Sequence, residues 1–128
     1  MDGVFDLFHA GHLESLERMK QYGSVSIVGV VSDEDAATYK RTPVINERNR
    51  VAMIEQCKFV DEVIFPCPLY VTPEFIKKHE IDVVVHGFKD DNDFENQRLF
   101  FENVCLTRIP YSNLENTTDI IARIRSCI

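Results

Sequence analysis

Gly3-Val4-Phe5-Asp6-Leu7-Phe8-His9-Ala10-Gly11-His12 is the stretch of this chain that decides the fold. An apolar strand end leads into a turn that bears Gly11, and a helical pattern follows in which Leu13, Leu16 and Met19 recur three apart. Two imidazoles therefore lie where a helix begins. A helix N-terminus offers free backbone N–H groups and a positive dipole end, which together suit phosphate. Gly11 carries no side chain, so a ligand can approach the backbone closely.

The histidine pair His9 and His12 has three interpretations. The rings can act as a helix cap and a buried, hydrogen-bonded side chain. They can ligate a metal, but zinc needs further ligands and only His79 and His86 remain as histidines. They can bind phosphate, which the helix start favours. We predict phosphate binding, with rings that are neutral in the empty site because the positive end of the helix disfavours imidazolium.

The composition is that of one small domain, and we expect residues 1–128 to form it. A net charge of −7 argues against a general nucleic-acid or membrane surface, since both require a basic footprint. No apolar run approaches the roughly 20 residues of a membrane span, and no cationic leader opens the chain, so a cytoplasmic protein is expected. The chain ends at Ile128 directly after its last predicted helix, so we expect no membrane-binding segment in it.

Apolar, β-branched runs alternate with helical patterns along the chain. We predict strands over residues 25–31, 60–65, 81–85 and 104–109. The predicted helices begin after capping side chains at Ser32, Asn46, Thr72 and Asn116. Residues 89–95 are expected to form an acidic loop and residues 94–101 a helix. The alternation predicts an α/β fold, a parallel sheet with helices on both faces, whose ligands bind beyond the carboxyl ends of the strands.

The ordered motifs resemble those of the cytidylyltransferases. The opening stretch resembles the family's His-x-Gly-His signature, and residues 116–121 resemble the end of its second signature, Arg-Thr-Glu-Gly-Ile-Ser-Thr-Thr. Between them, residues 28–34, 44–47, 57–63 and 72–75 resemble the choline-phosphate branch. The resemblance covers nearly the whole chain. It implies a Rossmann-like nucleotidyltransferase fold that uses CTP and Mg²⁺ and is usually a homodimer, with residues 57–63 a candidate interface.

The resemblance also implies roles for residues at matching positions. His9, His12 and Lys40 would be catalytic, holding the CTP phosphates and stabilising charge at the α-phosphorus. The implied nucleotide-binding residues are Gly3, Phe5, Gly11, His86, Gly87, Asn116, Thr117 and Thr118. The implied substrate-binding residues are Asp2 near the amino-alcohol cation, Arg50 near its phosphate, and Tyr70, whose ring offers an aromatic face to a quaternary ammonium. No dedicated metal cage is expected, so Mg²⁺ would arrive with CTP.

The implied reaction is direct cytidylyl transfer, a step of phospholipid synthesis in the Kennedy pathway. A phosphate oxygen of phosphocholine attacks the α-phosphorus of CTP in line, giving CDP-choline and pyrophosphate. Residues 70–72 and His86-Gly87 look more like the ethanolamine-phosphate branch, so CDP-ethanolamine is the alternative product. A catalytically degenerate nucleotide-binding homologue and another adenylyl- or cytidylyltransferase are further alternatives.

The chain departs from the family pattern at three places, one of which is Leu69, where the family has a tryptophan on the choline side. The family has an apolar strand ahead of the position of Asp2-Gly3, whereas only Met1 stands there in this chain, so we expect a truncated first strand. The arginine of the second signature is replaced by Tyr111. Arg108, nearby in sequence, is a candidate to replace that arginine.

Overall fold

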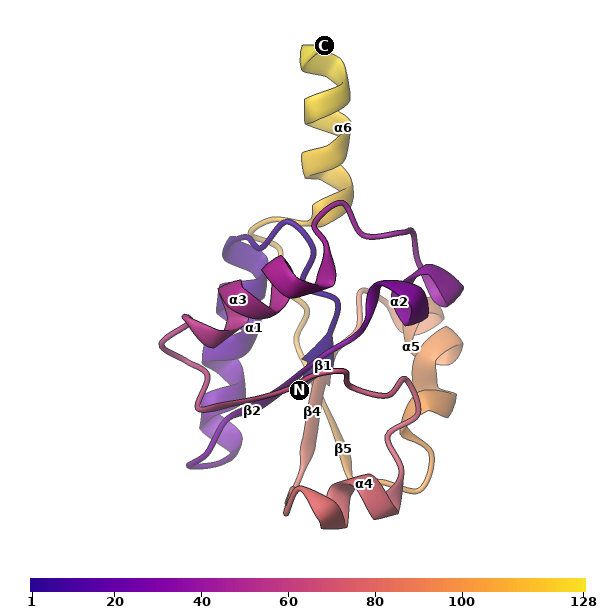
Figure 1. Ribbon diagram of the computed structural model, residues 1–128. Coiled ribbons are helices and arrows are strands. Elements are labelled where there is room, and N and C mark those ends of the chain that lie inside the picture. The colour runs from indigo at the N-terminus through magenta and orange to yellow at the C-terminus, as the bar shows by residue number, and fades with distance from the viewer.

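The computed structural model describes residues 1–128 and contains two small parallel sheets (Figure 1). The first has the order β1-β2-β3, from Asp2–Gly3, Ile27–Val30 and Glu62–Ile64. The second pairs β4, Val84–Gly87, with β5, Leu106–Ile109. The α/β class is confirmed, and each predicted strand overlaps an observed one.

Six α-helices connect and follow these strands. They are α1 (Ala10–Met19), α2 (Asp33–Tyr39), α3 (Glu47–Glu55), α4 (Pro73–Lys78), α5 (Asp91–Gln97) and α6 (Thr117–Cys127). Short 3₁₀ turns follow α1 and α5, at Lys20–Tyr22 and Arg98–Phe101. The four predicted caps, Ser32, Asn46, Thr72 and Asn116, each accept a hydrogen bond from the backbone N–H three residues later. None of the helices is both long and apolar enough to cross a membrane.

The loop predicted over residues 89–95 is wrong, because most of this segment belongs to α5. Asp90 is the N-cap of α5, and its Oδ1 accepts a hydrogen bond from the backbone N–H of Asp93 at 2.8 Å. Acidic side chains in the first turn also complement the positive end of the helix. The acidic residues therefore begin the helix instead of preventing it.

Helices cover both faces of the strands, as predicted. On one face, Leu16 and Met19 of α1 and Ile54 of α3 pack with Val28 and Val30 of β2. On the other, side chains of α4, α5 and the second 3₁₀ turn pack against β4. Helix α6 has no fully buried residue and projects away from the body of the molecule (Figure 1).

Strand β1 has two residues and pairs only with β2, through Asp2 opposite Gly29 and Gly3 opposite Val30. This agrees with the shortened first strand predicted from the sequence. Because β1 makes no backbone ladder with β4, the strands form two sheets instead of the single sheet expected. Side chains bridge the seam between them, with His86 Nδ1 of β4 lying 3.2 Å from Asp2 Oδ1.

Candidate active site

A cavity of about 600 Å³ lies beyond the carboxyl ends of β1 and β4. Its walls come from the β1–α1 loop, the α2–α3 loop, α5 and the N-terminus of α6. All eight residues that the sequence assigns to the nucleotide line it, together with His9, His12, Lys40 and Asp2. The structure therefore brings together segments spread from residue 2 to residue 118.

His9 and His12 form a stacked pair at the start of α1. The backbone N–H of Gly11 donates to His9 Nδ1 at 3.1 Å, and the backbone N–H of His9 donates to His12 Nδ1 at 3.2 Å. Both Nδ1 atoms are acceptors, so each neutral ring carries its proton on Nε2. The Nε2–H of His9 lies 3.2 Å from Thr117 Oγ1, whereas the Nε2 of His12 has no protein partner. The pair thus caps the helix and still leaves one N–H on the cavity wall.

The cavity disfavours additional positive charge when it is empty. Burial lowers the pKa of His12 from 6.5 to about 3, with smaller contributions from His9 and Lys40. Burial also lowers the pKa of Lys40, whose ammonium lies near the carboxylates of Asp93 and Asp2. A polyanion bound here would reverse this bias, since nearby negative charge stabilises the protonated forms. The electrostatics thus suit an anionic ligand.

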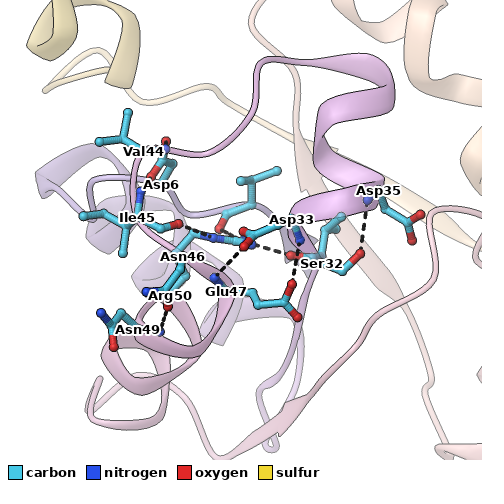
Figure 2. Close-up of polar contacts among 12 residues, drawn as sticks. Asp6, Ser32, Asp33, Asp35, Val44, Ile45, Asn46, Glu47, Asn49 and Arg50 are labelled. Atoms are coloured by element: carbon cyan, nitrogen blue, oxygen red, sulfur yellow. Dashed lines mark hydrogen bonds and ion pairs between the residues drawn. The ribbon is translucent and has the colours of Figure 1, made fainter.

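Asp6 joins three walls of the cavity, a role that the sequence motif did not reveal. Its carboxylate accepts from the backbone N–H groups of Val44 at 2.8 Å and Ile45 at 2.9 Å, in the loop that follows Lys40 (Figure 2). Its carbonyl accepts from Thr117 Oγ1 at 3.0 Å. The flanking residues Phe5 and Leu7 have φ values of 56° and 51°, so the loop takes a tight left-handed path around Asp6. Asp6 therefore fixes the loop after Lys40 through its carboxylate, and α6 through its backbone carbonyl, relative to the histidines.

Arg50, expected at the acceptor phosphate, is instead a buried scaffold residue. Its side chain is 0% exposed, and it does not line the cavity. Nη1 donates to the carbonyls of Val4 at 2.7 Å and Val31 at 2.9 Å, Nε donates to Ile45 O at 3.0 Å, and Nη2 pairs with Asp33 Oδ1 at 2.7 Å (Figure 2). Every nitrogen of the guanidinium donates at least one hydrogen bond within the protein and the side chain is fully buried, so it is not available to a substrate. This corrects the sequence-based assignment.

A further part of the cavity wall carries hydrogen-bond acceptors. Asp2 and His86 contribute one part of it, and α5 with its N-cap contributes Asp90, Asn92, Asp93, Asn96 and Gln97. Asp93 is held in place by the backbone N–H of Lys89 at 2.9 Å and by Gln97 Nε2 at 2.7 Å. These α5 residues were not among the expected site residues, because the acidic composition of residues 89–95 predicts a loop. The Asp-x-x-Asp spacing of a helix cap was the signal that would have found them.

Tyr70 and Arg108, both expected from the sequence to contact a substrate, lie outside the cavity. Tyr70 is 60% exposed, packs edge-on against Phe100 with ring centroids 5.1 Å apart, and does not line the cavity. Arg108 pairs with Asp91 at 3.0 Å and lies over the ring of Phe94, also outside the cavity. Arg108 therefore does not take the place of the arginine missing from the second signature.

The chain is similar in sequence and in fold to known proteins. The family model described as cytidylyltransferase-like matches residues 1–122. Choline-phosphate cytidylyltransferase A of Rattus norvegicus is 44% identical over 87 residues, which is 66% of this chain and 24% of that protein. Ethanolamine-phosphate cytidylyltransferase of Arabidopsis thaliana is 41% identical over 137 residues, which covers 100% of this chain and 32% of that protein. The probable ethanolamine-phosphate cytidylyltransferase of Encephalitozoon cuniculi is 45% identical over 69% of this chain and 27% of its own length.

The chain thus spans a third or less of the length of these relatives. Among solved structures, the lipopolysaccharide core biosynthesis protein from Thermoplasma volcanium GSS1 superposes with a TM-score of 0.69 at 25% identity. That match covers 88% of this chain and 94% of the other. It supports the same arrangement of strands and helices over most of the molecule.

Proposed function

The chain belongs to the cytidylyltransferase-like family, and on that premise we propose that it transfers the cytidylyl group of CTP to a phosphorylated amino alcohol. The observation that carries the proposal is the convergence of three phosphate-binding elements on one cavity. These are the free Nε2–H of His12, the ammonium of Lys40, and the N-terminus of α6 with Thr117 and Thr118.

The chemistry needs positioning and charge stabilisation more than a protein nucleophile. An oxygen of the acceptor's phosphate forms a bond to the α-phosphorus while the bond from that phosphorus to the bridging oxygen breaks, and pyrophosphate leaves with the electron pair. His12 and Lys40 supply N–H donors to the charge that develops on the α-phosphate. The backbone N–H groups of Thr117 and Thr118 and the hydroxyl of Thr118 donate to the β- and γ-phosphates at the helix N-terminus, while the Thr117 hydroxyl stays bonded to Asp6.

Mg²⁺ fits this site as a companion of the triphosphate. The chain has no group of three or more His, Cys, Asp or Glu side chains arranged to hold a metal ion. Magnesium commonly keeps several waters and is bound through substrate phosphates with one or two carboxylates, of which Asp2 and Asp93 line the cavity. When bound, it would neutralise part of the negative charge on the phosphates.

Replacing His12 or Lys40 with alanine tests the proposal. One preorganised donor to a transition state is worth about 10²–10³ in turnover, so each variant is expected to lose at least that much pyrophosphate release from CTP. His79→Ala and Lys78→Ala, whose side chains lie outside this cavity, are the matched controls. Circular dichroism and thermal unfolding establish that all four variants fold. Near-normal turnover in a folded His12→Ala or Lys40→Ala variant contradicts the assignment.

We propose phosphoethanolamine as the preferred acceptor. A primary ammonium donates hydrogen bonds, and the cavity wall formed by Asp2 and α5 offers carboxylate and amide oxygens to receive them. A quaternary ammonium prefers several aromatic faces, whereas the cavity offers the exposed ring of Tyr111 and the buried ring of Phe5; Tyr70 lies outside it and Phe94 is covered by Arg108. Phosphocholine, expected from the sequence, is the second candidate because a choline-phosphate relative is 44% identical.

Turnover with phosphoethanolamine, phosphocholine and glycerol-3-phosphate, measured side by side, tests the choice of acceptor. We expect the highest kcat/KM with phosphoethanolamine, and Asp2→Asn should raise the KM for it more than the KM for CTP. A higher kcat/KM with phosphocholine would reverse the ranking. CTP binding without turnover of any acceptor would instead identify a degenerate homologue. Sedimentation velocity tests the homodimer that the family resemblance implies.

A further inference from the structure

Arg41 is an unpaired guanidinium on the wall of the cavity. Of the eight arginines of this chain, five form ion pairs with carboxylates: Arg18, Arg50, Arg98, Arg108 and Arg123. The other three form no ion pair, and among them only Arg41 lines the cavity. It is exposed and lies in the α2–α3 loop directly after Lys40. The chain has 21 acidic residues, and most of its arginines pair with one of them. Arg41 differs from this majority because it has no carboxylate partner.

The one side-chain partner of Arg41 is a neutral hydroxyl at a helix start. Its Nη2 donates to Thr118 Oγ1 at 2.9 Å. Thr118 belongs to the first turn of α6, whose backbone N–H groups form the positive end of the helix. A cation held against that end is disfavoured electrostatically unless an anion lies between them. The position is therefore unfavourable in the empty site and favourable around a bound polyphosphate.

We infer that Arg41 binds the terminal phosphates of the nucleoside triphosphate, clamping them against the N-terminus of α6. The inference rests on the proposed function and names a residue that binds the leaving pyrophosphate. A guanidinium can donate two parallel hydrogen bonds to a phosphate, which the single ammonium of Lys40 cannot do. This chain has Tyr111 where the family's second signature has an arginine, and Arg108 lies outside the cavity. Arg41 thus supplies a guanidinium to the cavity from a different loop.

The position predicts selectivity for the number of phosphates. Arg41 contacts the helix start, so it should act on the β- and γ-phosphates and leave the nucleoside and α-phosphate unaffected. One charge-assisted hydrogen bond corresponds to about 10- to 100-fold in affinity. Removing Arg41 should weaken the binding of CTP and of free tripolyphosphate by that factor, while CMP binding changes less than about twofold.

Calorimetric titration of CTP, CMP and tripolyphosphate into four proteins tests this inference. The proteins are the unaltered chain, Arg41→Gln, Arg41→Lys and Arg108→Gln, the last a matched control outside the cavity. We expect the 10- to 100-fold loss only in the Arg41 variants, with Arg41→Lys recovering part of the CTP affinity because it keeps the charge. Arg108→Gln should leave all three affinities within about twofold.

The outcomes separate this inference from the proposed function. Unchanged CTP affinity in Arg41→Gln, or equal losses for CTP and CMP, overturns the role of Arg41, even where the unaltered chain turns over CTP. An Arg41-dependent affinity for tripolyphosphate without any preference for CTP or turnover supports the role and overturns the proposed function. Failure of the unaltered chain to bind any polyphosphate overturns both.

Discussion

Replacing Arg50 with methionine distinguishes a scaffold role from a substrate-binding role. Methionine fills much of the volume of the buried side chain but makes none of its hydrogen bonds. The carbonyls of Val4, Val31 and Ile45 then lose their partner, and Asp33, whose side chain is 35% exposed, is left to water. A scaffold role predicts a large loss of stability, and a substrate-binding role predicts a loss of turnover alone.

The expected loss follows from the burial of these groups. A buried acceptor left without its partner costs about 1–3 kcal/mol, so we expect the three carbonyls to account for a loss of about 3–5 kcal/mol, to which the partly exposed Asp33 adds little. Unfolding entropy per residue, taken over the 128 residues, converts that loss into a decrease in Tm of about 10–20 °C. Urea denaturation and differential scanning calorimetry measure the two quantities independently.

Arg48→Met is the matched control, since Arg48 lies on the same helix, is exposed and forms no ion pair. Its free energy of unfolding should change by less than about 0.5 kcal/mol. The reasoning is refuted by an Arg50→Met variant that unfolds at the same urea concentration as Arg48→Met but has lost turnover. That result would return Arg50 to the substrate.

Three other perturbations have definite expected outcomes. Because the pKa of His12 falls from 6.5 to about 3 on folding, the unfolded chain binds a proton that the folded chain excludes. The free energy of unfolding should therefore decrease as the pH drops from 6.5 toward 3, and it should decrease less in His12→Gln. Urea denaturation at several pH values measures this, and the same pH dependence in both proteins would contradict it. Gly29→Ala places a Cβ 2.4 Å from Cys67 Sγ, so it should destabilise the fold, and adding Cys67→Ala should restore part of the loss in a double-mutant cycle. Gly11→Ala places a Cβ 2.5 Å from Glu115 O and 2.9 Å from the His9 ring, so it should disturb the site locally. Turnover by the folded variant should fall, and a loss of activity that only reflects a loss of folded protein would argue against a local effect.

The features that the sequence revealed are local ones. Caps such as Ser32 and Asn116 depend on a side chain and a backbone N–H three residues apart, so their signal lies within one turn. The same holds for the start of α1, which the turn at Gly11 and the spacing of Leu13, Leu16 and Met19 already predict. The alternation of apolar runs and helical patterns then suffices for the α/β class.

The features that the sequence did not reveal depend on long-range contacts. The partners of Arg50 include the backbone carbonyls of residues 4 and 31. Every residue has a backbone carbonyl, so the residue types at these positions do not predict the contact. Tyr70 packs against Phe100, thirty positions away, and so points away from the cavity. The exception is α5, where a local capping signal at Asp90 was present but was outweighed by the acidic composition of the segment.

The three contacts of Asp6 also bear on the order in which the site is assembled during synthesis. Its partners lie 38, 39 and 111 residues further along the chain, so the last of them is translated long after the histidine motif. Contacts of such sequence separation form late, since the intervening chain must first be ordered. During synthesis, the residues of both sheets leave the ribosome before α6 does. The nascent chain can therefore bury its core around β2 while the cavity wall formed by α6 is still missing.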